Sequence, residues 1–309
     1  MQALLDVILP VFIVIGAGYL ASWRKLLTDN AIDGLMGFAQ TIAVPCLLFR
    51  AMWQLDLGEY FRFDLLFSFY AGAITCFIVG LFGARLIFGR DWEDSVVIGF
   101  SALFSNSLLI GLPITEQAYG EDALNGNYAI IALHSPLCYA IGITTMELAR
   151  ARGTELRRLP LTILRSLFRT PMVIGISIGI VFNLLSVELP TPMTEALGLL
   201  TRTALPCALF ALGGVLFRYR PEGDLRTILF VCALSLGLHP LVTYTLGTAF
   251  SLPTDAFRSA VVTASVAPGV NAYVFANLYG RAKRVAASSV LLATGMCIVT
   301  TWAWLHLLP

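Results

Sequence analysis

Long apolar stretches separated by short polar loops make up most of the chain. A helix needs about 20 mostly apolar residues to cross the hydrocarbon core of a bilayer. Ten windows of this kind occur, at roughly 4–22, 31–53, 64–88, 95–116, 126–148, 170–187, 195–217, 227–250, 257–279 and 285–305. The pattern therefore predicts an all-α polytopic membrane protein with ten transmembrane helices.

The composition agrees with this prediction and excludes several soluble classes. Of the 309 residues, 58% are hydrophobic and 13% are charged, whereas soluble domains have about 25% charged residues. A formal net charge of +1 argues against a basic nucleic-acid binder, so we expect no nucleic-acid partner. The six cysteines fall inside the apolar windows without metal or disulfide spacing. We therefore expect no metal and no cofactor.

Basic residues are concentrated in alternate loops. The loops after the first, third, fifth, seventh and ninth windows hold 16 of the 20 Lys and Arg residues. By the positive-inside rule these loops face the cytoplasm, which places both termini on the extracytoplasmic side. The segment 151–169 is then a cytoplasmic linker.

The two halves of the chain share short sequence motifs. Residues 43–49 read Ala-Val-Pro-Cys-Leu-Leu-Phe and residues 204–210 read Ala-Leu-Pro-Cys-Ala-Leu-Phe, at an offset of 161. At an offset of 160, Tyr-Gly recurs at 119–120 and 279–280, and Ser105 matches Ser265. The sequence therefore predicts one five-helix repeat at 1–150 and a second at 170–309. Because five is odd, the second repeat must be inverted, as in secondary transporters with a midplane substrate site.

Two windows contain helix-breaking residues near an asparagine. The fourth reads Asn-Ser-Leu-Leu-Ile-Gly-Leu-Pro at 106–113, and the ninth reads Ala-Pro-Gly-Val-Asn at 267–271. In lipid, backbone groups freed by proline must face protein or a wet cavity. Broken helices at matching positions of two repeats indicate a binding site, and their positive N-terminal ends favour an anion. Proline kinks and asparagines that serve only helix packing are the alternative.

The same motifs resemble those of the auxin efflux carrier family. The stretch 106–113 is similar to that family's fourth-helix motif, and Ala-Pro-Gly-Val-Asn-Ala-Tyr-Val-Phe-Ala at 267–276 is similar to the ninth-helix motif of its bacterial members. Ala-Val-Pro at 43–45 and Phe-Ala-Leu-Gly at 210–213 resemble its second and seventh helices. The resemblance covers the whole chain and implies the fold of the bile acid/sodium symporters. Helices 1, 2, 6 and 7 would form a scaffold, and helices 3–5 and 8–10 a transport domain in which broken helices 4 and 9 cross.

The resemblance also implies a substrate site at this crossing. In the plant relatives, polar groups there hold an organic carboxylate. Here Asn106 and Asn271 would supply those groups, while Ser105 stands where plant carriers usually have proline. Bacterial members are associated with malonate-like carboxylates, so we expect a small organic anion as substrate and the bacterial inner membrane as location. The expected substrate-binding residues are Asn106, Asn271, Ser105, Gly111, Pro113, Pro268 and Gly269.

Three further side chains are candidates for a role along the path. Arg50 and Arg202 lie within windows and away from the basic loops. They either line an outer vestibule that attracts anions or reach the outer headgroups. His134 is the titratable side chain best placed for proton coupling, with a structural histidine as the alternative. Gly175 and Gly179 have the spacing of a close contact between helices.

We interpret the chain as a secondary transporter of small organic anions that works by alternating access, and not as an enzyme. An intramembrane enzyme would need a catalytic pair such as two Asp, or a histidine-rich metal cluster, inside the windows, and the sequence has neither. An ion channel is a further alternative. It would need a polar stripe along one helix and a ring of repeated filter residues, and the sequence shows neither. A non-transporting ligand receptor on the same fold stays an alternative, and so does assembly into a homodimer. The expected partners are the substrate and membrane lipid.

Overall fold

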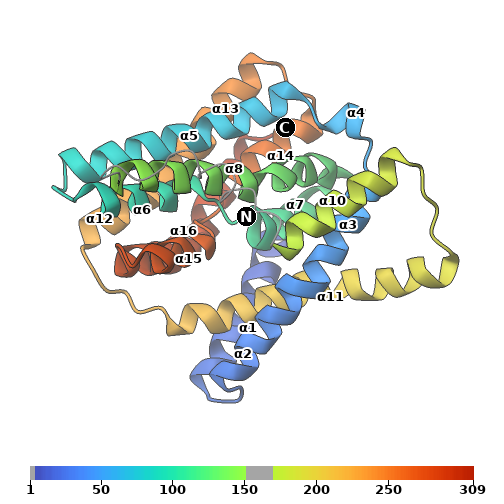
Figure 1. Cartoon of the computed structure of the whole chain (residues 1–309), viewed down its shortest axis with the longest axis horizontal. Coiled ribbons are helices and arrows are strands. Elements are labelled where there is room, and N and C mark those ends of the chain that lie inside the picture. Colours follow the sequence, from blue (N-terminus) through green and yellow to red (C-terminus); the bar gives the residue numbers. More distant parts are fainter. Residues whose placement is uncertain (1–3, 151–169) are drawn as a thin grey trace.

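The computed structural model describes residues 4–150 and 170–309, and these residues are almost entirely helical (Figure 1). The predicted linker, 151–169, lies outside the described residues. The α-helices are α1 (Leu9–Trp23), α2 (Asp29–Phe38), α3 (Val44–Gln54), α4 (Leu57–Tyr60), α5 (Phe63–Leu86), α6 (Trp92–Leu103), α7 (Leu112–Tyr119), α8 (Asn125–Arg150), α10 (Pro171–Leu184), α11 (Thr191–Arg218), α12 (Leu225–Ala233), α13 (His239–Ala249), α14 (Thr254–Ala264), α15 (Asn271–Tyr279) and α16 (Lys283–Leu307). Short turns between them are the π-helical η1 (Leu4–Ile8), η2 (Ala39–Ala43), η3 (Ser107–Gly111) and η6 (Leu234–Leu238), and the 3-10 turn η4 (Glu121–Leu124).

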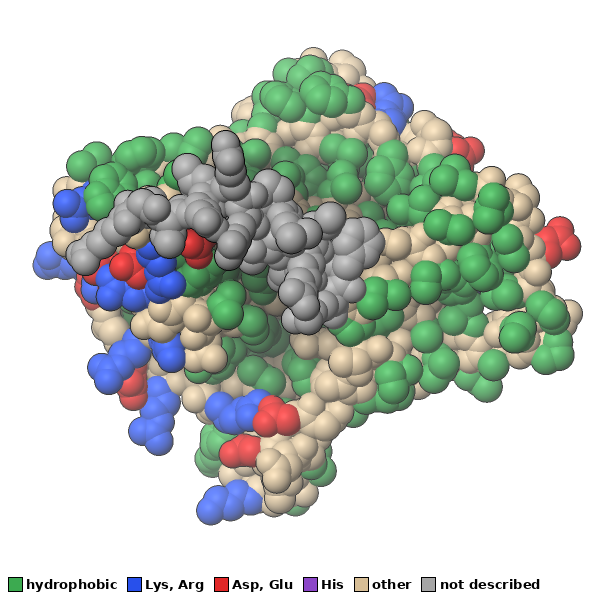
Figure 2. Space-filling view, in the orientation of Figure 1, with side chains coloured by type: hydrophobic (Ala, Val, Ile, Leu, Met, Phe, Trp, Pro, Cys, Tyr) green, Lys and Arg blue, Asp and Glu red, His purple; other side chains and the backbone are tan. Residues whose placement is uncertain are grey.

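Seven helical stretches in the described part of the chain are long and apolar enough to cross a membrane. They are Asp6–Trp23, Asp29–Gln54, Phe63–Leu86, Asn125–Arg150, Thr191–Arg218, Leu225–Ala249 and Lys283–Leu307. A shorter apolar helix is α10, and the predicted windows 95–116 and 257–279 are each interrupted. Figure 2 shows hydrophobic side chains over much of one face, with charged ones gathered mostly toward one side. These are the features of a multi-pass membrane protein.

Prolines determine where the helices contain π-helical turns. Each π turn among the described residues ends two positions before a proline, and those prolines are Pro10, Pro45, Pro113 and Pro240. A proline cannot donate to the carbonyl four residues earlier, and its ring clashes with that carbonyl. The wider turn relieves the clash. As a result η2 joins α2 to α3, and η6 joins α12 to α13, into continuous helical stretches.

The helices pack mainly within two groups. Group A comprises α1, α2, α3, α10 and α11, and group B comprises α5, α6, α8 and α12 to α16. In Figure 1, α5 and α13 lie side by side in group B, and α1 and α2 lie beside α11 in group A. The predicted close helix contact at Gly175 and Gly179 is confirmed, because a Cβ at either glycine would lie 2.5 Å from a backbone oxygen of α3.

Within the described residues, ion pairs bring the loops around α2, α6, α12 and α16 to one end of the molecule, which we call the basic end. There the Arg90 guanidinium pairs with Asp224 at 3.3 Å, which joins the loop after α5 to the loop before α12. At the opposite end the Arg258 side chain donates to the carbonyl oxygen of the C-terminal Pro309 at 2.9 Å. These two contacts mark opposite ends of group B.

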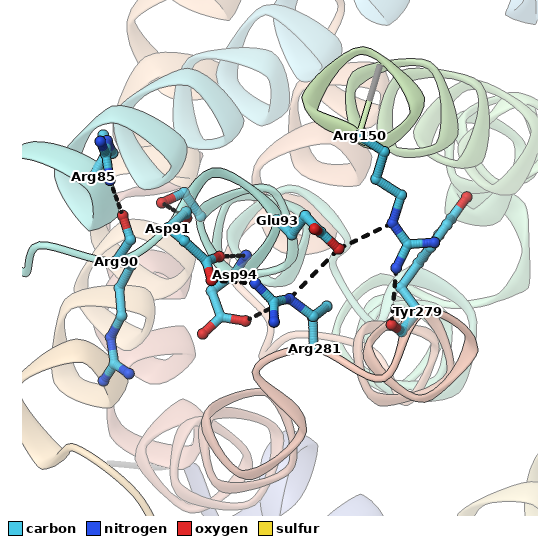
Figure 3. A network of polar contacts seen from close by, with 9 residues as sticks. Arg85, Arg90, Asp91, Glu93, Asp94, Arg150, Tyr279 and Arg281 are labelled. Carbon is cyan, nitrogen blue, oxygen red and sulfur yellow. Dashed lines mark hydrogen bonds and ion pairs between the residues drawn. The ribbon is translucent and has the colours of Figure 1, made fainter. Parts of the chain in front are cut away.

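A network of ion pairs holds group B together at the basic end (Figure 3). Arg281 lies between α15 and α16 and pairs with Asp91, with Asp94 at 3.3 Å and with Glu93 at 3.6 Å, all at the start of α6. Arg150, at the end of α8, pairs with the same Glu93 at 3.0 Å. Burial raises the pKa of Asp91, but the hydrogen bonds from the Asp94 amide and the Arg281 side chain outweigh it, so this pKa lies below its ordinary value.

Candidate functional site

The two interrupted segments cross each other at their breaks. One break separates α6 from η3 and the other separates α14 from α15. The Asn106 N–H donates to the carbonyl oxygen of Ala267, and the Gly269 N–H donates to that of Phe104, both at 2.8 Å. This reciprocal pair is the pattern of an antiparallel bridge, with Ser105 opposite Pro268. Four of the main-chain groups at the two breaks are therefore paired with each other.

The first break lies earlier in the chain than the sequence predicts. The motif places helix-breaking residues at Gly111 and Pro113, yet the helical backbone continues through both, from η3 into α7. The break is instead at 104–106, where Phe104 and Asn106 have ψ angles of 89° and 54°. Pro113 does not break the helix because the π turn η3 accommodates it. The second break, at 265–270, does contain its proline.

The two segments also differ in length after the crossing. Gly120 and Gly280 follow α7 and α15 with φ angles of 85° and 72°. Gly120 lies 15 positions after Ser105, whereas Gly280 lies 12 positions after Pro268. The offset between the halves therefore changes from 163 at the crossing to 160 at these glycines. Ser265, which the sequence comparison aligned with Ser105, is not its counterpart at the crossing.

A small cavity of about 50 Å³ lies at the crossing, between the two groups. A water needs about 10–15 Å³ on this measure, so the cavity has room for a few atoms in this conformation. Of the seven predicted substrate-binding residues, the structure brings three to its wall: Ser105, Asn106 and Asn271. Leu48 of α3 and Ile176 of α10 border it from group A.

The two asparagines present polar groups to this cavity. The Asn106 side-chain amide nitrogen is buried and has no hydrogen-bond partner among the described residues. The Asn271 side-chain oxygen accepts a hydrogen bond from the Tyr139 hydroxyl at 3.2 Å, which orients its amide group. Buried polar groups are nearly always paired. The unpaired amide of Asn106 therefore marks a position where a ligand acceptor would be favourable.

Two helix N-termini also start at the cavity. Helical backbone begins again at Ser107 and at Asn271, and both residues line the cavity wall. The N–H groups at the start of η3 have no main-chain acceptor within the described residues, whereas at the start of α15 the N–H groups of Ala272 and Tyr273 donate to the carbonyl oxygens of Gly269 and Val270. The helix dipole adds partial positive charge at both starts. Such ends bind anions. The cavity therefore combines donors and positive potential without a carboxylate in its lining.

The other predicted substrate-binding residues lie outside the cavity lining. Pro268 and Gly269 belong to the bridge, where a Cβ at Gly269 would lie 3.1 Å from the Phe104 ring. Gly111 packs against Thr263 of α14. Pro113 lines a different, larger cavity. Their roles in binding stay predictions, and this placement favours backbone shaping over ligand contact.

His134 connects α8 to the crossing. Its side chain is buried, and its Nε2 atom lies 3.1 Å from the carbonyl oxygen of Ser105. Its ring also packs against Phe104, with 4.7 Å between the ring centroids. These contacts give the histidine a structural role at the break. Its role in proton coupling stays a prediction.

Arg50 and Arg202, which we call the arginine pair, line one large cavity. Its volume is about 700 Å³, and it lies between α1, α3 and α11 on one side and α7 and α8 on the other. Neither arginine has an ion pair within residues 4–150 and 170–309. Glu116 and Glu121 line the same cavity, so its walls carry both signs of charge.

The structure adds polar residues that the sequence reasoning missed. Gln40, Ser107, Ser135 and Tyr139 lie at the crossing, the first three in the cavity lining and Tyr139 as the partner of Asn271. Gln40 is the one with a signal in the sequence, because it is an amide in the middle of an apolar window. No cluster of three His, Cys, Asp or Glu side chains that could hold a metal occurs in the described part of the chain.

A family model described as membrane transport protein matches residues 3–305. The chain belongs to this family. The auxin efflux carrier resemblance is thereby confirmed, since the membrane transport protein family includes those carriers. An auxin efflux carrier component 8 of Arabidopsis thaliana is 21% identical, over 97% of this chain and 95% of its own length.

Two other relatives, one bacterial and one from the mouse, have different names. A protein of Rhizobium meliloti with the provisional name malonate transporter is 25% identical, over 100% of this chain and 97% of its own length. A lysosomal cholesterol signaling protein of Mus musculus is 25% identical over 68% of this chain, which corresponds to 25% of that longer protein. Membership of the membrane transport protein family makes this chain a transporter-family protein rather than a member of an enzyme family.

Proposed function

We propose that this protein is a secondary transporter that moves small organic anions, carboxylates in particular, by alternating access. The observation that supports this most is the crossing cavity, where the unpaired amide of Asn106 and two helix N-termini meet. Each hydrogen bond to a charged ligand is worth about 1.5–3 kcal/mol. The name of the Rhizobium meliloti relative favours a malonate-like dicarboxylate. We propose no catalytic step.

We propose further that the chain crosses the membrane ten times, in two inverted repeats, 1–150 and 170–309. The interrupted segments count as one crossing each, and α10 counts as a short one. The reciprocal bridge at Ser105 and Pro268 supports this arrangement, because a two-fold relation between the repeats exchanges its two hydrogen bonds. Group A corresponds to the scaffold helices 1, 2, 6 and 7. Group B corresponds to the transport helices 3–5 and 8–10.

Movement of group B against group A would give the crossing cavity access to alternate sides. The 700 Å³ cavity lies between the groups and away from the basic end, so it is a candidate outer vestibule. The arginine pair would attract anions there, and Glu116 and Glu121 would limit that attraction.

We propose that the basic end faces the cytoplasm of a bacterial inner membrane, with both termini outside. Cysteine labelling tests this in two variants, Lys25→Cys and Glu188→Cys, made in a background without native cysteines. An impermeant reagent added outside should label position 188 and not position 25. The reverse result would mean that the topology is inverted.

Flux in proteoliposomes tests the transport proposal. Uptake of malonate is compared with uptake of its uncharged diamide at a defined membrane potential. We expect saturable uptake of the anion and none of the diamide. Preference for the diamide would refute the anion assignment, and saturable binding without flux would favour a ligand receptor. The Mus musculus relative, named for signaling, is the reason to measure binding separately.

A further inference from the structure

A second cleft, distinct from the crossing cavity, lies at the basic end. Its volume is about 230 Å³, and its walls contain one acidic side chain, Glu222, and four basic side chains: Arg218, Arg220, Lys283 and Arg284. Tyr219 and Tyr273 form part of the same wall, with ring centroids 4.9 Å apart. Cationic side chains beside aromatic hydroxyl groups suit a phosphate group.

Two of these four basic side chains lack a carboxylate partner. Arg218 is paired with Asp33 at 2.5 Å, and Arg284 lies 3.5 Å from Glu222. Within the described part of the chain, no ion pair or hydrogen bond of the side chain is found for Arg220 or Lys283. The cleft therefore has positive charge that the protein itself does not neutralise.

The start of α16 adds to this positive charge. Helix α16 follows Ala282, a left-handed residue with φ of 41°, and has no side-chain cap. Its first two residues, Lys283 and Arg284, are basic, although a helix N-terminus favours acidic residues. In contrast, α6 starts with an aspartate cap and two acidic residues, and α12 has an aspartate cap. An anion in the cleft would supply the negative charge that α16 lacks.

The cleft also joins the two helix groups. Arg218 ends α11 of group A, and α16 belongs to group B. The connecting segment is held on α16 by Ser288, whose hydroxyl donates to the Glu222 carbonyl oxygen at 2.7 Å and accepts from its N–H at 3.0 Å. An anion bound between Arg220 and Lys283 would contact both sides of this connection.

We propose that the cleft binds a phosphate group, supplied by the headgroup of an anionic phospholipid, and thereby restrains group B against group A. Basic pockets between membrane helices on the cytoplasmic side bind such headgroups. A ligand shifts a conformational equilibrium only through different affinities for the two states. Binding itself requires no transport, whereas the effect on transport rests on the proposed function.

The binding test uses the purified full-length chain in detergent, with thermal unfolding as the readout. Phosphatidylglycerol, phosphatidylcholine and inorganic phosphate are titrated separately. The double variant Lys283→Gln/Arg284→Gln is compared with a matched control, Arg24→Gln/Lys25→Gln, which removes two charges from another basic loop. Arg220→Gln is a third variant, whose side chain has no ion pair to lose.

We expect phosphatidylglycerol to stabilise the wild type saturably, with a half-saturating concentration about tenfold higher in the cleft variants. The control should change less than about twofold. Stabilisation by inorganic phosphate alone, lost in the same variants, would support the phosphate site and identify a soluble ligand. Equal losses in both double variants, equal effects of phosphatidylcholine, or no effect of any phosphate would overturn the proposal.

Uptake by proteoliposomes with and without phosphatidylglycerol tests the effect on transport. We expect the lipid to change the uptake rate of the wild type and not of the cleft variants. Uptake that does not depend on the lipid, although the lipid binds, would refute the restraint of group B against group A. The proposed binding site in the cleft would still stand. Absence of uptake in every lipid would count against the proposed function alone.

Discussion

The substitution Asn106→Ala should separate ligand binding from stability. The Asn106 side-chain nitrogen is buried and unpaired, and an unsatisfied buried donor costs about 1–3 kcal/mol. Its removal should therefore leave the substrate-free protein at least as stable as the wild type. A ligand that accepts a hydrogen bond from this amide would lose about 1.5–3 kcal/mol, which corresponds to about 10- to 150-fold in affinity.

Asn127→Ala is the matched control, because the protein uses the amide nitrogen of this buried asparagine, although its side-chain oxygen has no partner among the described residues. The Asn127 amide donates to the hydroxyls of Thr115 at 3.0 Å and Thr263 at 2.8 Å, and it lines neither cavity. Its loss removes both bonds and leaves the Thr263 hydroxyl without a partner among the described residues, while Thr115 still donates to the Gly111 carbonyl oxygen, so we expect a loss of about 1–3 kcal/mol in stability. Malonate affinity should change little.

Both variants are measured by thermal unfolding in detergent with and without malonate, and by uptake into proteoliposomes. We expect Asn106→Ala to abolish the malonate-dependent shift while unfolding at or above the wild-type temperature. If Asn106→Ala loses as much stability as Asn127→Ala, the amide is structural. If its malonate affinity is unchanged, the crossing cavity is not the binding site.

Three further sets of substitutions test the packing, the ion network and the vestibule. A Cβ at Gly213 would lie 1.8 Å from the Ile15 carbonyl oxygen, so Gly213→Ala should separate α1 from α11 and lower the unfolding temperature, whereas Gly16→Ala, with open space, should not. The pKa of Asp91 is lower in the folded protein, so its contribution to stability is present above about pH 3.9 and is lost as the pH falls below that. Arg281→Gln should therefore flatten the acid dependence of unfolding below about pH 3.9, and an unchanged profile would contradict this. Neutralising the arginine pair to Gln should weaken malonate uptake from the outer side and its salt dependence, and an unchanged salt dependence would exclude an electrostatic vestibule.

The sequence predicts the helices well wherever apolar length decides the outcome. The window 126–148 corresponds to α8 at 125–150, and the window 285–305 to α16 at 283–307. Burial in lipid requires about 20 apolar residues, so such windows are hard to misplace. The close contact at Gly175 and Gly179 was predictable for a different reason. The two glycines are four positions apart, which places both on one helix face.

The interior of the site was less predictable, because proline has two outcomes in a helix. Pro268 lies in a real break, while Pro113 follows a π turn that keeps its helix intact. The one local difference is that Pro268 is followed directly by Gly269, a dipeptide that favours a turn, whereas Pro113 is followed by Ile114. The position of the first break, at 104–106, has no such signal and depends on the packing around it. Tyr139 was missed because its pairing with Asn271 joins residues 132 positions apart.

The bridge at the crossing has a consequence for how much sequence can vary there. Its hydrogen bonds use the N–H groups of Asn106 and Gly269 and the carbonyl groups of Phe104 and Ala267. The residues that face each other, Ser105 and Pro268, do not use their own N–H groups in the bridge. A residue without an N–H therefore fits at either position. Serine at 105 and proline at 268 are therefore equivalent for the architecture. The geometry of the crossing therefore does not depend on which of these two residue types stands at either facing position.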